Sequence, residues 1–177
     1  TISDGHGGTA TGNVDVTVTY PTTAESLFYS SDTPPVANNP DSNAVELGVK
    51  FTADKNGTIT GIRFFKEAQD TGTHQADLWS ASGTLLATAT FTGETASGWQ
   101  QVNFATPVAI TAGTTYTAAY HTNVGHYAGG TAGYFSTSHT AGDLTAPASA
   151  GVYAYSSSDA FPTGTYNANN YWVDLVY

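Results

Sequence analysis

The chain has 177 residues, of which 10% are charged, and 14 acidic against 4 basic side chains give it a formal net charge of −10. This charge repels phosphate backbones and anionic lipid headgroups, so nucleic acid and membrane surfaces are poor partners. Cysteine is absent, which excludes disulfides, a thiolate nucleophile and Cys-based zinc sites, and no apolar run is long enough to insert into a bilayer.

A glycine-rich segment opens the chain, and Val14, Val16 and Val18 follow it in alternation with polar residues. This pattern predicts a turn that leads into a half-buried strand. Residues 1–20 resemble the closing strand of the cadherin-like and immunoglobulin-like repeats of bacterial surface adhesins. The resemblance implies that they end a preceding repeat and that a short linker follows. No signal peptide is recognisable, and the abrupt start at Thr1 leads us to expect a fragment of a longer protein.

Strand patterns then recur over most of residues 25–177. Val45, Leu47 and Val49 alternate with polar residues, as in a strand with one face on a core. The Asn56-Gly57 pair that follows predicts a hairpin turn into the next strand. A calcium loop is the alternative there, but it lacks a glutamate at the twelfth position. Further strands are predicted over residues 58–66, 75–79, 84–92, 99–104, 115–121, 151–155 and 171–177.

Short strands at regular intervals predict an all-β sandwich or barrel. The poverty of the chain in Lys, Glu, Arg and Leu points the same way, because these residues favour helices. Two long connections rich in glycine, serine and alanine, residues 123–133 and 138–150, are where such a scaffold displays a binding surface.

Five motifs stand in order between residues 25 and 177: GTITGIRF at 57–64, LWSASGTLLA at 78–87, ETASGWQ at 94–100, FPT at 161–163 and YWVD at 171–174. Together they resemble a bacterial family named domain of unknown function 4082, an appendage of multidomain secreted proteins. The resemblance implies a jelly-roll-like antiparallel β-sandwich, related in style to carbohydrate-binding modules, in a secreted or cell-surface protein with neighbouring domains. It carries over no catalytic residue and no ligand.

Histidines form one group of candidate ligands. His121 and His126 flank a loop that contains Asn123, and His74 precedes another strand. If these loops met at one end of the sandwich, the imidazoles could hold a transition metal. Hydrogen bonding within the loops is the plainer alternative, and we prefer a role in contacting sugar.

Asp174 stands inside the last predicted strand, where a buried carboxylate would be costly without a partner. It must therefore be paired, metal-bound or exposed. Jelly-roll carbohydrate-binding modules often hold a structural calcium between an early carboxylate and one in the last strand. By that analogy, Asp174 with Glu46 or Asp41 is the expected calcium site, and an exposed or backbone-bonded aspartate is the alternative.

Sugar recognition needs flat apolar faces flanked by polar groups, and the chain has 11 tyrosines and 3 tryptophans. Trp99 follows a glycine turn and alternates with polar residues, which favours an exposed ring. Tyr127 and Tyr153 lie in or beside the long loops, where exposed aromatic rings mark a binding site. Tyr127 is the first candidate for sugar contact, although a place in the core is the alternative for each ring.

No nucleophile elbow, H-E-x-x-H motif or phosphate-binding loop is present, so we expect no enzyme. The sequence favours an adhesive module that binds a polysaccharide or cell-surface glycan. A structural spacer or protein-interaction domain of an adhesin stalk is the alternative. A hydrolase would need two carboxylates or a metal-histidine cluster in a cleft.

Overall fold

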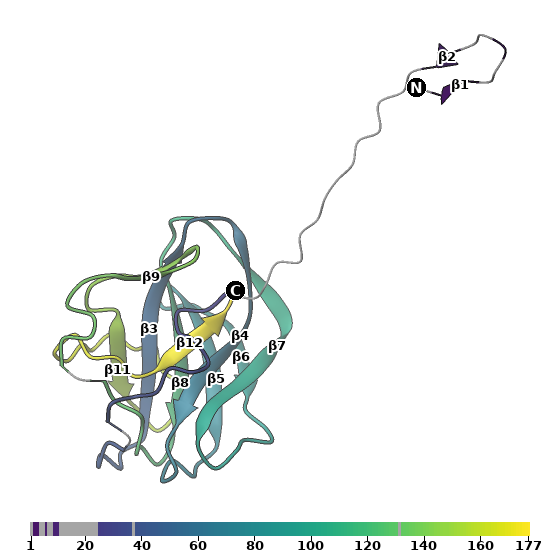
Figure 1. Cartoon of the computed structure of the whole chain (residues 1–177). Helices are drawn as coiled ribbons and strands as arrows, with labels where there is room; N and C mark the ends of the chain where they lie inside the picture. Colours follow the sequence, from purple (N-terminus) through teal and green to yellow (C-terminus); the bar gives the residue numbers. More distant parts are fainter. Residues whose placement is uncertain (1, 4–5, 7–8, 11–24, 37, 131) are drawn as a thin grey trace.

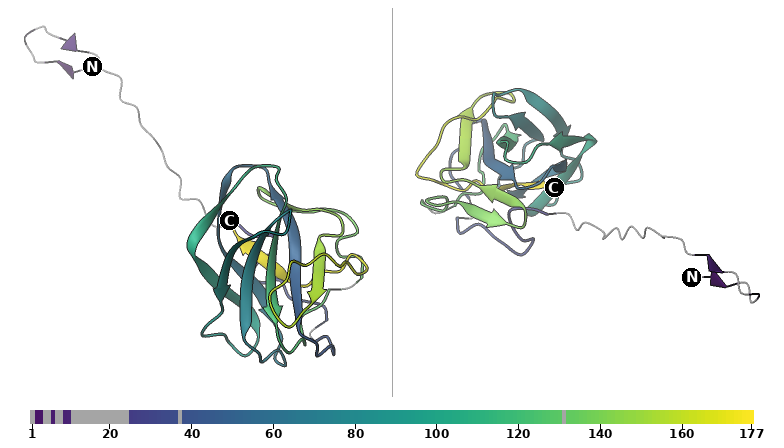
Figure 2. Two further views of the ribbon diagram at one scale, coloured as in Figure 1. Left: turned by 180° about the vertical axis from the view of Figure 1, so that it is seen from behind. Right: turned by 90° about the horizontal axis from the view of Figure 1, so that it is seen from above.

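The computed structural model of the chain describes residues 2–3, 6, 9–10, 25–36, 38–130 and 132–177. Over these residues the chain forms strands and loops, and every strand pair is antiparallel. No helix of the described chain is long and apolar enough to cross a membrane. Two sheets pack against each other around a shared apolar core (Figures 1 and 2). This confirms the expected β-sandwich.

A short N-terminal ladder is formed by β1 (Ile2–Ser3) and β2 (Thr9–Ala10), which pair with each other. The turn predicted in the glycine-rich segment falls mostly on residues outside the described ones. The strand that we predicted after that turn, and the adhesin-like repeat to which we assigned it, lie outside the described residues.

The larger sheet has seven strands: β3 (Val45–Ala53), β5 (His74–Ser80), β6 (Leu85–Thr90), β8 (Tyr116–Thr122), β9 (His139–Ala141), β10 (Leu144–Ala146) and β11 (Gly151–Tyr155). Their order is β6-β5-β8-β3-β10-β9. Strand β11 pairs with the first half of β3, on the side away from β8 (Figure 1). Strands β9 and β10 lie within residues 138–150, which we predicted to be loop.

The smaller sheet has three strands, β4 (Gly57–Lys66), β7 (Gly98–Ile110) and β12 (Val173–Val176), with β4 in the centre. Alternate residues of both sheets fill the core. Phe64 of β4 and Tyr120 of β8 stack with ring centroids 4.1 Å apart, which ties the two layers together.

The hairpin predicted at Asn56-Gly57 is wrong, because β3 and β4 belong to different sheets. The Asn56 side chain accepts a hydrogen bond from the Ala112 backbone N–H, so it fastens the corner where the chain changes sheet. A Cβ at position 57 would lie 2.0 Å from the Tyr177 ring. A side chain at position 57 would therefore require the Tyr177 ring to move.

The connection after β11 covers the outer face of the larger sheet. It is closed at its base by two backbone hydrogen bonds between Tyr153 and Gly164. Along its length, Phe161 packs on the Trp79 ring at 5.8 Å, and the Ser156 carbonyl accepts a hydrogen bond from His121. We call residues 156–163 the covering loop.

Candidate functional site

A pocket with a volume of about 360 Å³ opens at the end of the sandwich where β11 stops. Its walls are made mainly of tyrosine and asparagine side chains: Asn39, Asp41, Tyr127, Tyr153, Tyr155, Tyr166, Asn169 and Tyr171. We call it the tyrosine pocket. Its volume lies at the small end of the range typical of ligand sites.

Three separate segments supply the five tyrosines. Tyr153 and Tyr155 come from β11, where their spacing of two places both on one face. Tyr127 is contributed by the loop after β8, and Tyr171 meets its ring edge to face at 5.8 Å. Tyr155 and Tyr166 are 58% and 62% exposed, whereas Tyr127 is buried. The pocket therefore combines the buried Tyr127 ring with two rings, Tyr155 and Tyr166, that extend into solvent.

The segment that leads into β12 holds an unusual backbone. Asn167, Ala168 and Trp172 all have positive φ angles, of 48°, 47° and 56°. Residues with side chains seldom adopt this conformation, and such strain clusters at functional sites. Backbone hydrogen bonds from Gly133 and Phe135 to the carbonyls of Asn167 and Ala168 hold it in place. This unusual backbone therefore lies within the stretch that supplies Tyr166 and Tyr171.

Polar groups in the pocket are arranged as acceptors. The Tyr155 hydroxyl donates to the Asp41 carboxylate, which also accepts hydrogen bonds from Asn43. Burial opposes ionisation of Asp41, but the hydrogen bonds from Tyr155 and Asn43 outweigh it and lower the pKa of the carboxyl group. The Asn169 side-chain oxygen is buried with no hydrogen-bond partner. The Asp41 carboxylate can therefore also accept a hydroxyl from a ligand, whereas the Asn169 oxygen is closed off from the pocket.

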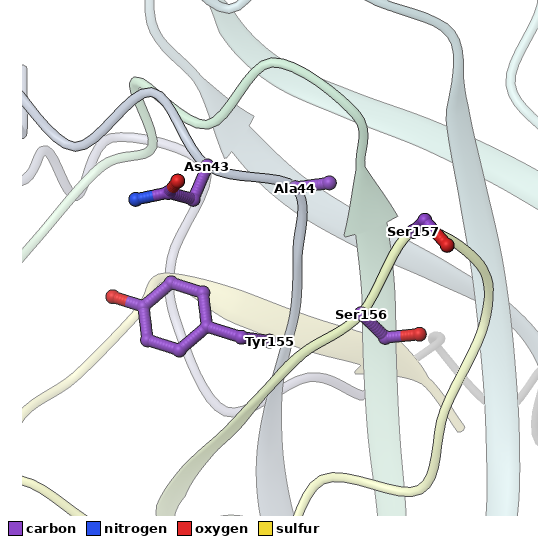
Figure 3. A pocket seen from close by; sticks show the side chains of 5 residues that line it. All are labelled: Asn43, Ala44, Tyr155, Ser156 and Ser157. Atoms are coloured by element: carbon purple, nitrogen blue, oxygen red, sulfur yellow. The ribbon is translucent and has the colours of Figure 1, made fainter.

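A second, shallower hollow of about 320 Å³ adjoins this pocket. It is lined by Asn43, Ala44, Tyr155, Ser156 and Ser157, so the Tyr155 ring is shared by both sites. Figure 3 shows the Tyr155 ring and the Asn43 amide on one side of this hollow, with both serines on the other. The two hollows therefore adjoin at Tyr155.

Three of the residues proposed from the sequence lie in the tyrosine pocket, namely Tyr127, Tyr153 and Asp41. His126 stands beside it, because its backbone N–H donates to the Asp41 carbonyl at 2.7 Å. Asn123 is exposed and has its side-chain oxygen against Gly72. These two do not line the pocket.

The other aromatic and histidine candidates lie elsewhere. Trp99 packs on the smaller sheet, where its indole N–H donates to the Asp32 carbonyl and Arg63 lies over its ring. His74 is fully buried and faces the core, whereas His121 lies under the covering loop. The structure therefore does not gather His74, His121 and His126 at one end of the sandwich.

Asp174 is buried and paired with Arg63, whose Nε and Nη2 lie 2.9 and 2.7 Å from one carboxylate oxygen. The other oxygen accepts the Leu27 N–H. Neither Glu46 nor Asp41 joins this set. Among the alternatives considered from the sequence, the structure shows a paired carboxylate.

Glu46 instead belongs to a group of three carboxylates with Asp77 and Asp159. Burial, followed by repulsion from Asp77 and Asp159, raises the pKa of Glu46 to about 9. Burial also raises the pKa of Asp77 to about 6, although the Thr88 hydroxyl opposes this. Thr88 and the Ala160 backbone affect these pKa values, but neither makes a hydrogen bond of ordinary geometry to the two carboxylates.

Comparison with known proteins covers most of the sandwich. A family model described as domain of unknown function DUF4082 matches residues 31–173. The chain belongs to this family. No curated protein matches the chain.

The DUF4082 match spans both the tyrosine pocket and the three carboxylates, yet sequence reasoning missed several of their residues. Tyr166 and Asn169 escaped because they lie in an irregular segment with no strand pattern. Asp159 was also missed, because it lies in a loop with no strand pattern. The cluster of tyrosine and asparagine at residues 166–171 is the signal that could have marked them, because both residue types recur at glycan-binding surfaces.

Proposed function

We propose that this DUF4082 domain is a non-catalytic module that binds neutral glycans in the tyrosine pocket, as part of a secreted or cell-surface protein. The observation that carries the proposal is the gathering of 5 of the 11 tyrosines around one pocket. Folding alone does not explain Tyr155 and Tyr166, because large exposed rings on a surface commonly mark binding sites.

The chemistry of the pocket suits a sugar. A pyranose ring has an apolar face of C–H groups and a rim of hydroxyls, so it packs on aromatic faces and exchanges hydrogen bonds with short polar side chains. Tyr155 and Tyr166 offer the faces, and the Asp41 carboxylate offers an acceptor.

Charge favours a neutral ligand. The net charge of −10 and the ionised Asp41 in the pocket both repel sulfate and uronate groups. Neutral polysaccharides carry no such penalty.

The pocket also favours binding over hydrolysis. Glycosidases commonly use two carboxylates placed about 5–10 Å apart across the scissile bond. Among the described residues that line the tyrosine pocket, Asp41 is the one carboxylate, and it is held by Tyr155. This supports a module that holds glycan without cleaving it.

The test is an array of neutral cello-, xylo-, malto- and chito-oligosaccharides, followed by calorimetry on the best binder. We expect Tyr155→Ala and Tyr166→Ala each to weaken binding about tenfold or more, equivalent to at least about 1.4 kcal/mol. Tyr29→Ala is the matched control, since Tyr29 is 79% exposed and lies outside the pocket. Retained binding in both pocket variants, or blank arrays, would contradict the proposal and favour a structural spacer.

A further inference from the structure

The outer face of the larger sheet holds two carboxylates that are wholly shielded from solvent. Glu46 on β3 and Asp77 on β5 are both 0% exposed, and β8 lies between their strands. Asp77 is directly opposite Ala119, which in turn is opposite Gly48. Neither small residue carries a large side chain above the sheet, and carboxylate oxygens of Glu46 and Asp77 approach within 4.8 Å across β8.

Asp159 completes the group from above. It belongs to the covering loop, and carboxylate oxygens of Glu46, Asp77 and Asp159 all lie within 4.8 Å of one another. Two of the three side chains thus come from rigid strands, and the third comes from a loop that is closed at its base by the Tyr153–Gly164 hydrogen bonds.

The buried oxygens of Glu46 and Asp77 make no hydrogen bond of ordinary geometry within the described residues. All four oxygens of Glu46 and Asp77 lack a hydrogen-bond partner, and within the described chain neither residue takes part in an ion pair. Three of the four basic side chains are engaged elsewhere: Lys55 with Asp143, Arg63 with Asp174 and Lys66 with Glu94. Buried charges are otherwise paired or bound to metal, so a cation would stabilise these carboxylates in their ionised form.

The oxygen ligands indicate the kind of cation. Carboxylate oxygens are the preferred ligands of hard divalent ions. Calcium binds oxygen at about 2.3–2.6 Å, so two oxygens of one calcium site are at most about 5.2 Å apart. Magnesium binds at about 2.0–2.1 Å, demands a near-ideal octahedron and gives up its water reluctantly. We propose that Glu46, Asp77 and Asp159 form a calcium site that fastens the covering loop to the outer face of the larger sheet.

Such a site would stabilise the folded chain, because the unfolded chain does not hold the three carboxylates together. Glu46 and Asp77 are 31 positions apart along the chain, and Asp159 is 82 positions beyond Asp77. Calcium would therefore close long loops as it binds. The competing account is that Glu46 and Asp77 share a proton and need no metal.

The experiment starts with protein treated with EDTA and dialysed into metal-free buffer at neutral pH. Thermal melting is followed with 1 mM CaCl₂ and with 1 mM MgCl₂, and calorimetry gives the calcium stoichiometry. We expect one calcium per chain and a melting temperature raised clearly more by calcium than by magnesium. An equal response to the two ions, or no response to calcium, would overturn the proposal.

Variants locate the ion. Asp159→Asn should weaken calcium binding at least tenfold while the metal-free protein stays folded, since Asp159 lies on a loop. Asp54→Asn makes the same charge change at an exposed position and should leave calcium affinity unchanged. Glu46→Gln removes a buried ligand and should abolish the calcium response. If Glu46→Gln stabilises the metal-free protein and calcium has no effect on the parent, the shared proton is the correct account and the site is refuted.

Discussion

His74 is buried between two carboxylates, with Nε2 lying 2.8 Å from an Asp70 oxygen and Nδ1 2.8 Å from a Glu94 oxygen. Burial alone would lower its pKa, but the hydrogen bonds and charges of Asp70 and Glu94 outweigh burial and raise it. Lys66 also pairs with Glu94, and Glu67 lies near Asp70. The protonated imidazole is therefore favoured by folding.

The raised pKa values of His74 and Glu67 make the stability of the fold depend on pH. A histidine whose folded pKa is raised stabilises the fold below its unfolded pKa of about 6.5, and this contribution is lost as the pH rises through the folded value. The pKa of Glu67 is raised to about 7, mainly by burial, so its contribution is lost in the same direction between about pH 4.5 and 7. Stability should therefore fall as the pH rises from 6 to 9.

Urea unfolding of metal-free protein at pH 6, 7, 8 and 9 measures this fall in stability with rising pH. His74→Asn should be less stable than the parent at pH 6, and the difference should shrink toward pH 9. His139→Asn is the control, because the His139 ring hydrogen-bonds to the Leu27 backbone carbonyl, whereas His74 lies against two carboxylates. A gap between parent and His74→Asn that stays constant with pH would contradict the assignment.

At the scale of elements, Arg63 joins β4 to β12 and to the segment before β3. Its guanidinium binds Asp174 through two nitrogens and also reaches the Ser26 hydroxyl and the Phe28 carbonyl. Burial raises the pKa of Asp174, whereas the charge of Arg63 lowers it. Loss of Arg63 would leave the buried Asp174 carboxylate without its positively charged partner.

We expect Arg63→Ala to destabilise the fold by about 3–5 kcal/mol, as for other broken buried ion pairs. Urea or thermal unfolding measures the change. Lys55→Ala breaks the exposed pair with Asp143, and it should leave stability almost unchanged because solvent screens that pair. Equal effects of the two substitutions would contradict a structural role for the buried pair.

Some strands with one face on the core were predictable from their alternation, whereas the short β10 was not. In β3, the alternation of Val45, Leu47 and Val49 with polar residues marked the strand correctly, and β11 was predicted with its observed bounds. The same alternation misled about exposure. Glu46 occupies a polar position of β3, yet the covering loop buries it, and no local pattern announces that a distant loop will cross that face.

Pairing between strands was harder to predict from the sequence. The Asn56-Gly57 pair is as suited to a hairpin as to a corner between sheets, and the choice depends on which distant strands compete for β3 and β4. Likewise, Glu46 and Asp77 meet only because β8 lies between β3 and β5. Such strand order is a property of the whole fold.

At the scale of the molecule, the two proposed sites share one stretch of chain. The covering loop begins directly after Tyr155, carries Asp159 and ends shortly before Tyr166. A cation beneath the loop would thus hold the two exposed rings of the tyrosine pocket in place. Ordering a binding surface before the ligand arrives lowers the entropic cost of binding.

The central claim is that neutral glycan binds in the tyrosine pocket, and aromatic NMR of tyrosine-labelled protein tests it most directly. On titration with the best oligosaccharide from the array, we predict shifts in the ring signals of Tyr127, Tyr153, Tyr155, Tyr166 and Tyr171. The signals of Tyr29 and the core residue Tyr120 should stay fixed. Shifts confined to Tyr29 or to other tyrosines outside the pocket would contradict the account, as would ring signals that ignore every neutral glycan.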